Sequence, residues 1–507
     1  MEESQGTRSW TARVRAEGEN LLQRTPLALV AVVGVVAGVV GVPAAAGAAA
    51  GNVPVQVLAI NDFHGRIAAS NGNDSKLVTG PGPDGVYAAA DAQDSDDVVR
   101  RVGGAVAMAS TVRKLQGEFR RKAGGSAASF FVGVGDLIGN APPESADYRD
   151  EPTIEVLDAL GMDVSAAGNN EFDRGTQELR RISAATDGQY TDNVTACQGV
   201  TPGKDGCFGA DEHAFAGAQF PYLAANVVSR ATGEPMLPPY HVLYTPEGLR
   251  VAFIGVVLEK TPEHAPPGTL PDVEFLDEAN AVNRWVPEIR AQGIEAIGVL
   301  VHDGGAPAAA SPDPSRCDQF AGPIIDTNSR IDPAVDVVVT GHTHKAYTCQ
   351  LPVPQGEPRL VTQAGAHGRL VTDIRLTLDR ASGDVDRAAT YTATNVPVTR
   401  AAPDQRIAAI VDYWTAGPSN QPAAGEPAAV TAPVDAAASE TPSRAWLGAL
   451  ALVVVVVVVV GTGVVLRRRT LERQFGVAAR RRNPIRERRP GRHAGESPAD
   501  DPANVRR

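Results

Sequence analysis

Residues 55–65 read VQVLAINDFHG, an apolar run, Val55–Ile60, followed at once by a polar cluster that contains Asp62 and His64. Short apolar runs bounded by polar or turn residues are typical of buried β-strands. In an extended chain, residues two apart point the same way, so Asp62 and His64 can face one ligand together. The stretch therefore predicts a buried strand that carries two possible metal-binding side chains at its end.

The same pattern of an apolar run and then a polar cluster occurs four more times along the chain. These clusters are Gly135-Asp136, Gly168-Asn169-Asn170-Glu171-Phe172-Asp173, His302-Asp303-Gly304-Gly305 and Gly341-His342-Thr343-His344. Further strands are predicted at Ser129–Val134, Val251–Val257, Ala296–Val301 and Val335–Thr340, and helices at Gly104–Lys122 and Asp277–Gln292. Alternating strands and helices predict a layered α/β core. In a mostly parallel sheet, the residues just past the carboxyl ends of the strands share one rim, so we expect the five clusters to meet there.

Each cluster taken alone has an ordinary explanation. An Asp-x-His pair can be a surface or capping feature, Gly-Asp is a frequent turn, and His302 could be a buried core histidine. Asn169-Asn170 alone fits a turn or a helix cap. The shared order and strand-end position of all five clusters favour a functional site. Imidazole and carboxylate groups suit Zn, Mn or Fe, and the lack of cysteine in the clusters argues against a thiolate site.

The five clusters resemble the motifs of the calcineurin-like metallophosphoesterases, and of their 5′-nucleotidase branch in particular, over roughly residues 53–400. The resemblance implies a sandwich of β-sheets flanked by helices and two divalent metal ions. One ion would take Asp62, His64, Asp136 and His344, and the other would take Asp136, Asn169, His302 and His342. Such a centre implies in-line hydrolysis of a phosphate ester, because paired cations clamp the phosphoryl group and lower the pKa of a bridging water.

Two features depart from the family pattern. Asn170 replaces the His of the family motif Gly-Asn-His-Glu, and Asp173, which orients that His in the family, has no imidazole to hold. His367 is a candidate replacement, although an exposed loop residue is the simpler expectation. The carboxyl-terminal domain that binds the nucleoside in family members also has no predicted counterpart, which favours a more open site.

The two ends of the chain predict export and a membrane anchor. Residues 1–50 include an apolar stretch that follows several Arg, as in a signal peptide or an amino-terminal anchor. After a predicted metallophosphoesterase domain, 51–402, come a helix remnant and Pro/Ala-rich linker, 403–445, and an apolar run, 446–466, long enough to span a bilayer as a transmembrane helix. The tail, 467–507, holds thirteen Arg against five acidic residues, so it is predicted to lie in the cytoplasm and the domain outside the cell.

Composition and cysteine content agree with that location. The 507 residues carry a net charge of −12 despite the basic tail, so the acidic domain is not expected to bind nucleic acid. Four cysteines in an exported domain favour two disulfides, for which we prefer Cys197–Cys207 and Cys317–Cys349, with zinc ligation as the rival explanation. Residues 69–101 are predicted to form a surface loop. Its Asp91, Asp94, Asp96 and Asp97 could bind a cation, although a solvated acidic loop is the commoner case.

The sequence thus predicts a cell-surface phosphoesterase with two divalent ions, acting on nucleotides or other small phosphate esters. The alternative is a metal-retaining pseudoenzyme that serves as a surface binding or interaction module. The oligomeric state stays open.

Overall fold

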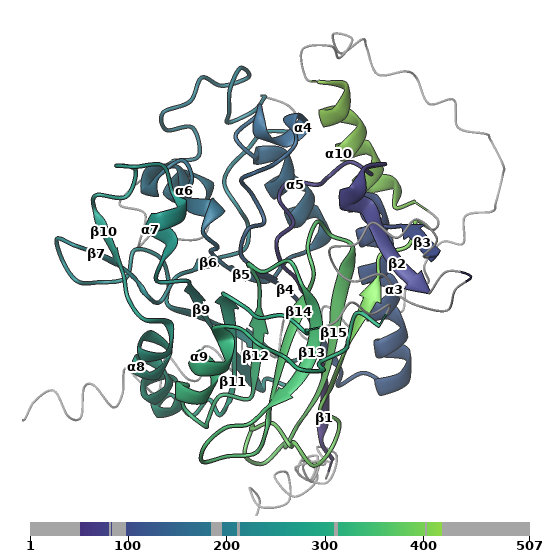
Figure 1. Ribbon diagram of the computed structural model, residues 1–507, viewed down its shortest axis with the longest axis vertical. Coiled ribbons are helices and arrows are strands. Elements are labelled where there is room, and N and C mark those ends of the chain that lie inside the picture. The colour runs from purple at the N-terminus through teal and green to yellow at the C-terminus, as the bar shows by residue number, and fades with distance from the viewer. Residues whose placement is uncertain are drawn as a thin grey trace, which may run out of the picture. The chain divides into compact units, whose positions relative to one another are not determined.

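Two six-stranded sheets form the centre of the protein (Figure 1). The computed structural model describes residues 51–80, 83, 98–183, 195–209, 213–308, 313–400 and 403–417. In spatial order, the first sheet contains β16 (Thr392–Pro397), β15 (Leu370–Leu378), β1 (Val53–Ile60), β4 (Ala128–Val134), β5 (Val164–Ala166) and β6 (Tyr222–Leu223). The second contains β13 (Ala346–Leu351), β14 (Arg359–Ala364), β12 (Val337–Thr340), β11 (Ala296–His302), β9 (Arg250–Val257) and β8 (Tyr240–Tyr244). Each sheet is parallel at its centre and has antiparallel strands toward an edge.

Helices and two small ribbons complete the described structure. The ribbons are β2 (Lys76–Gly80) with β3 (Val98–Arg101), and β7 (Val227–Ser229) with β10 (Val273–Phe275). The α-helices are α3 (Ala105–Ala123), α4 (Pro143–Ala146), α5 (Glu151–Leu160), α6 (Thr176–Ile182), α7 (Thr261–His264), α8 (Glu278–Ala291), α9 (Ile324–Arg330) and α10 (Gln405–Ala416). Short 3₁₀ turns lie at Asn73–Ser75 and Asn170–Phe172.

The two sheets pack face to face and helices cover their outer faces. Side chains such as Val57 of the first sheet and Phe253 of the second share the inner core. The outer face of the first sheet packs against α3, α5 and α10, and that of the second against α8 (Figure 1). The result is a helix–sheet–sheet–helix sandwich. Strands buried on both faces read as nearly continuous apolar runs, which is why the sequence revealed them.

The five predicted strands and both predicted helices are present, with shifts of one or two residues at their ends. Helix α8 begins after Asp277, whose side chain accepts a hydrogen bond from the Asn280 backbone N–H at 2.8 Å, as an N-cap residue does. The expectation of a single sheet rim is wrong, because the polar clusters come from two facing sheets: three follow strands of the first sheet, and two follow β11 and β12 of the second.

Residues 69–101 are not simply a loop. They include the exposed antiparallel pair β2–β3, whose strands were too short and too polar to stand out in the sequence. The four aspartates Asp91, Asp94, Asp96 and Asp97 lie outside the described residues, as do residues 1–50 and 418–507 with the predicted signal peptide, membrane span and basic tail. Within the described part of the chain, no helix combines the length and apolar character that crossing a membrane requires.

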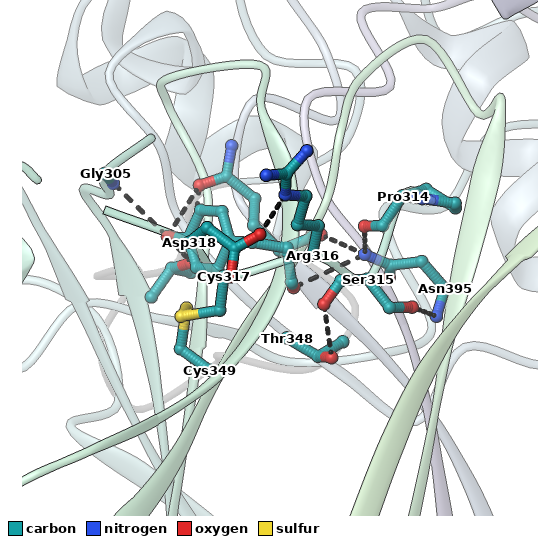
Figure 2. Close-up of a disulfide and its surroundings, with 12 residues drawn as sticks. Gly305, Pro314, Ser315, Arg316, Cys317, Asp318, Thr348, Cys349 and Asn395 are labelled. Atoms are coloured by element: carbon teal, nitrogen blue, oxygen red, sulfur yellow. Dashed lines mark hydrogen bonds and ion pairs between the residues drawn. A yellow bond between two sulfur atoms is a disulfide. The ribbon is translucent and has the colours of Figure 1, made fainter. Parts of the chain in front are cut away.

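Both preferred disulfides are present. Cys197 and Cys207 have Cα atoms 4.9 Å apart, and Cys317 and Cys349 have Cα atoms 5.3 Å apart. Figure 2 shows that the second bridge joins the segment after β11 to β13. In the same region, Thr348 Oγ1 donates to the Ser315 carbonyl at 3.0 Å, so a covalent bond and a hydrogen bond hold this segment against the edge of the second sheet.

Candidate metal centre

The segments that follow β1 and β4 continue side by side beyond the sheet. The Asp62 N–H donates to the Gly135 carbonyl at 3.0 Å, and the His64 N–H donates to the Asp136 carbonyl at 3.0 Å. These bonds place the Asp62, His64 and Asp136 side chains at one end of the sandwich, where all three are buried. The first two predicted clusters therefore meet.

Five of the seven candidate ligands adopt left-handed backbone rather than the extended backbone that we expected. The φ angle is 49° at Asp62, 48° at His64, 47° at Asp136, 69° at His342 and 58° at His344. Positive φ is uncommon outside glycine and often marks functional sites. The Asp62 and His64 side chains do face the same group of donor atoms. A tight turn brings them there, and the alternation of side chains along an extended strand does not.

One group of donor atoms collects around the end of β1. His344 Nε2 lies 3.2 Å from Asp62 Oδ1 and 3.1 Å from His64 Nε2. His64 Nε2 lies 3.8 Å from Asp136 Oδ2. These contacts bring together four donors from the ends of β1, β4 and β12.

A second group lies on the other side of the Asp136 carboxylate. His302 Nε2 is 3.2 Å from Asp136 Oδ1, and His342 Nδ1 is 2.9 Å from Asn169 Oδ1. Donor atoms of Asp136, His302 and His342 lie within 4.8 Å of one another. The structure thus brings all seven predicted ligand side chains together, and Asp136 presents one oxygen to each group.

Two of the histidine rings are oriented by backbone carbonyl groups. His64 Nδ1 donates to the Gly139 carbonyl at 3.0 Å, and His302 Nδ1 donates to the Val134 carbonyl at 2.7 Å. Each ring therefore turns its Nε2 toward the donor cluster, as metal-ligating histidines do. His302 Nε2 is buried, and the Asp136 carboxylate is 3.2 Å from it. A buried ring nitrogen beside a carboxylate fits a cation site.

The pKa shifts of the histidines at the centre favour the binding of a cation. Burial lowers the pKa of His64, and burial together with His302 lowers the pKa of His342 to about 4. Burial would also lower the pKa of His302, but the Asp136 carboxylate outweighs burial and raises it to about 10. Without a cation, His302 thus keeps a proton that offsets the Asp136 charge, and a divalent cation would replace that proton.

Glu171 is a functional residue that the sequence reasoning did not single out. Its carboxylate is buried and accepts four backbone N–H groups, from Asp136 at 2.8 Å, Gly168 at 2.6 Å, Leu137 at 2.9 Å and Ile138 at 3.4 Å. It therefore fixes the loops that carry two of the candidate ligands. In the sequence, the signal for Glu171 was its position directly after Asn169-Asn170 in one of the five polar clusters.

Asn170 and Asp173, the two candidate catalytic residues, form a hydrogen-bonded pair. Asn170 Nδ2 donates to Asp173 Oδ2 at 2.8 Å, and the Asn170 backbone N–H donates to Asp136 Oδ1 at 2.8 Å. Burial raises the pKa of Asp173. Both residues line a cavity of about 240 Å³, whose charged lining also includes Arg149, Arg174, Asp150 and Glu178.

His367 is not the exposed loop residue that the sequence suggested. The ring is half-buried and lies beside two candidate ligands, with ring centroids 5.8 Å from His64 and 5.4 Å from His344. Its backbone N–H donates to the Asp62 carbonyl at 2.7 Å. The sequence named His367 only as a candidate replacement for the family imidazole. The neighbouring residues gave no sign of its position beside Asp62, because that contact joins residues about three hundred positions apart.

Comparison with a solved structure shows which fold the chain has. The 5′-nucleotidase precursor of Thermus thermophilus matches with a TM-score of 0.50 and 21% identity, over 72% of this chain and 59% of that chain. The sandwich of mixed sheets with flanking helices is thus the metallophosphoesterase fold. No family model matches the chain.

Sequence relatives identify the family. Endonuclease YhcR of Bacillus subtilis is 28% identical over 334 residues, which are 66% of this chain and 23% of that protein. Cell wall protein Lmo0130 of Listeria monocytogenes is 30% identical over 365 residues, which are 69% of this chain and 40% of that protein. Other relatives are named 2′,3′-cyclic-nucleotide 2′-phosphodiesterase/3′-nucleotidase or 5′-nucleotidase. The chain belongs to this family of 5′-nucleotidases and calcineurin-like phosphoesterases, which confirms the resemblance, and it spans less than half the length of YhcR and of Lmo0130.

Proposed function

We propose that this protein is a cell-surface phosphoesterase that hydrolyses nucleotides or other small phosphate esters at a centre of two divalent cations. The observation that carries the proposal is the position of Asp136 between two donor groups. Its Oδ2 lies 3.8 Å from His64 Nε2, and its Oδ1 lies 3.2 Å from His302 Nε2. A carboxylate with one oxygen toward each group is suited to bridge two cations.

The residues that would hold the cations follow from the two groups. Asp62, His64, Asp136 and His344 would hold one, and Asp136, Asn169, His302 and His342 would hold the other. Nitrogen and oxygen donors without cysteine suit Zn, Mn or Fe. When bound, paired cations polarise a phosphoryl group and activate water at neutral pH.

The other side chains of the site position the substrate. Asp173 holds the Asn170 amide through Nδ2, which leaves the second amide hydrogen free to donate to a phosphoryl or leaving-group oxygen. An amide cannot supply a titrating proton, so esters with good leaving groups should react fastest.

The location at the cell surface is supported by the disulfides and by the sequence at both ends of the chain. Two disulfides are expected in an oxidising compartment. The apolar stretches within 1–50 and 446–466 and the arginines that follow the second one favour export with a membrane anchor. One relative is itself named a cell wall protein.

Hydrolysis by the full-length protein in detergent tests the proposal. The protein loaded with Mn²⁺ or Zn²⁺ should hydrolyse an activated aryl phosphate or aryl phosphodiester, and Asp136→Ala should abolish that activity. A panel of nucleotides, sugar phosphates and cyclic diesters then defines the substrate. Absence of phosphate release from every member of the panel by metal-loaded protein would overturn the proposal.

Asn170 favours one alternative, a metal-retaining pseudoenzyme that acts as a surface binding module. Its support is the loss of the family imidazole beside an intact ligand set. The same assay separates the two functions, because a binding module would hold the cations and release no product.

A further inference from the structure

We infer that His367 is an additional ligand of the cation held by Asp62, His64 and His344, which gives that cation a third imidazole. The inference rests on the proposed two-cation centre and adds a residue to it. Three rings lie around one point: the ring centroids are 5.1 Å apart for His64 and His344, 5.8 Å for His64 and His367, and 5.4 Å for His344 and His367. One ring nitrogen of each lies within 4.8 Å of the others.

The loop between β14 and β15 is built to hold His367 at this place. The His367 backbone N–H donates to the Asp62 carbonyl at 2.7 Å, so the loop is held against the segment that carries Asp62 and His64. Gly368 lies so close to the Phe63 ring that a Cβ at this position would be 2.9 Å from a ring carbon. His367 itself has a φ of 62°, like the left-handed candidate ligands nearby. Such strain is retained where the surrounding contacts enforce it.

The Nδ1 atom of His367 has unused bonding capacity. It is buried, and among the described residues it has no hydrogen-bond partner. A buried polar atom without a partner costs about 1–3 kcal/mol, so native structures usually satisfy it. A cation bound through Nδ1 would satisfy this atom.

The distances agree with coordination of one ion. Two nitrogen ligands about 2.1 Å from a metal, at angles of about 90–110°, lie roughly 3.0–3.4 Å apart. His64 Nε2 and His344 Nε2 are 3.1 Å apart, and His344 Nε2 and Asp62 Oδ1 are 3.2 Å apart. These three donors already have the spacing of neighbouring ligands. One His367 ring nitrogen also lies within 4.8 Å of a ring nitrogen of His64 and of a ring nitrogen of His344.

A third imidazole has a chemical consequence. The group around His64 would then supply three ring nitrogens, whereas the group around His302 supplies two. Imidazole suits Zn, Fe and Ni, whereas oxygen donors suit Mn and Mg. The cation beside His367 should therefore be the more zinc-selective of the two.

The test is the binding of Co²⁺ to metal-free, full-length His367→Gly, followed by calorimetry and visible absorption. Glycine suits the left-handed backbone at this position, so the variant removes the ring with little strain. Loss of outer-sphere partners alone weakens metal binding by about 10–100-fold, so loss of a direct ligand should weaken one Co²⁺ site by at least about 10-fold and change its absorption bands. Added imidazole should restore the bands. His241→Ala, on the edge strand β8, is the matched control and should bind Co²⁺ as the wild type does.

The outcomes separate this inference from the proposed function. Unchanged Co²⁺ affinity and spectrum in His367→Gly would overturn the ligand role. Full metal binding with reduced turnover would also overturn it, and would assign His367 to the substrate. If wild-type protein binds cobalt but hydrolyses no phosphate ester, the proposed function fails, while the effect of His367→Gly on the cobalt spectrum still decides the ligand role.

Discussion

The Glu171 carboxylate is the point at which the architecture of the centre can be tested most directly. Glu171→Gln keeps the shape of the side chain but turns one of its two oxygens into an NH₂ group. Oε2 accepts the N–H groups of Asp136 and Gly168, and Oε1 accepts those of Leu137 and Ile138. The amide can serve one pair and must present hydrogen to the other. We expect its oxygen to stay with the shorter pair, at 2.8 and 2.6 Å.

The expected cost follows from these bonds. The Leu137 N–H loses an acceptor at 2.9 Å, and a buried donor without a partner costs about 1–3 kcal/mol. Burial raises the pKa of Glu171 to about 8, so unfolding is compared at about pH 9, where the carboxylate is ionised. The two bonds that remain then change from a charged to a neutral acceptor and lose roughly 1 kcal/mol each, and removal of a buried charge offsets part of the loss. A net loss of about 3 kcal/mol is expected, which in a domain of this size lowers Tm by about 4 °C.

The assay is thermal unfolding of metal-free protein, with cation binding measured on the same samples. Because Glu171 orients the backbone of Asp136 and Gly168, the variant should also bind Mn²⁺ or Zn²⁺ more weakly. Glu357→Gln, an exposed position, is the matched control and should change neither quantity. A Tm that stays within about 1 °C of the wild type, well inside the expected shift, together with unchanged cation affinity, would refute the reasoning.

Three further predictions concern catalysis, pH and the disulfide. Asn170→His should raise kcat on nucleoside monophosphates, because an imidazole held by Asp173 can assist the leaving group. Such assistance contributes about 10²–10⁴-fold in enzymes. An equal or lower kcat in metal-loaded protein would reject this prediction. Burial raises the pKa of Asp158 to about 7, so between about pH 4 and pH 7 the folded protein holds a proton that the unfolded chain has released, and stability falls as the pH rises. Asp158→Asn should therefore raise the urea midpoint at about pH 8 and change it little at about pH 4, and equal shifts at both pH values would contradict the pKa assignment. Replacing Cys317 and Cys349 with Ser opens a loop of 32 residues and should lower the free energy of unfolding by about 4 kcal/mol in denaturant titrations. A loss below about 1 kcal/mol would show that the bridge constrains the unfolded chain little.

The sequence by itself determined the chemical identity of the centre. Donor residues such as Asp62 and His342 directly follow runs of apolar residues, and such runs must be buried wherever they fold. A polar residue at the end of a buried strand lies at an edge of the core, so strand pattern and donor type together predicted a metal site. The same local reasoning located the helices, because amphipathic spacing acts over a few residues.

The tertiary structure decided how these pieces meet. The pairing of two sheets, the left-handed turns at Asp62 and His64, the four N–H groups around Glu171 and the approach of His367 to His344 had no local signal. His302 reaches the Val134 carbonyl across 168 positions, and the His342 backbone reaches the Asp62 carboxylate across 280. Such contacts depend on which apolar faces pack against each other, and that choice is made by burial summed over the whole core rather than by the residues near any one motif.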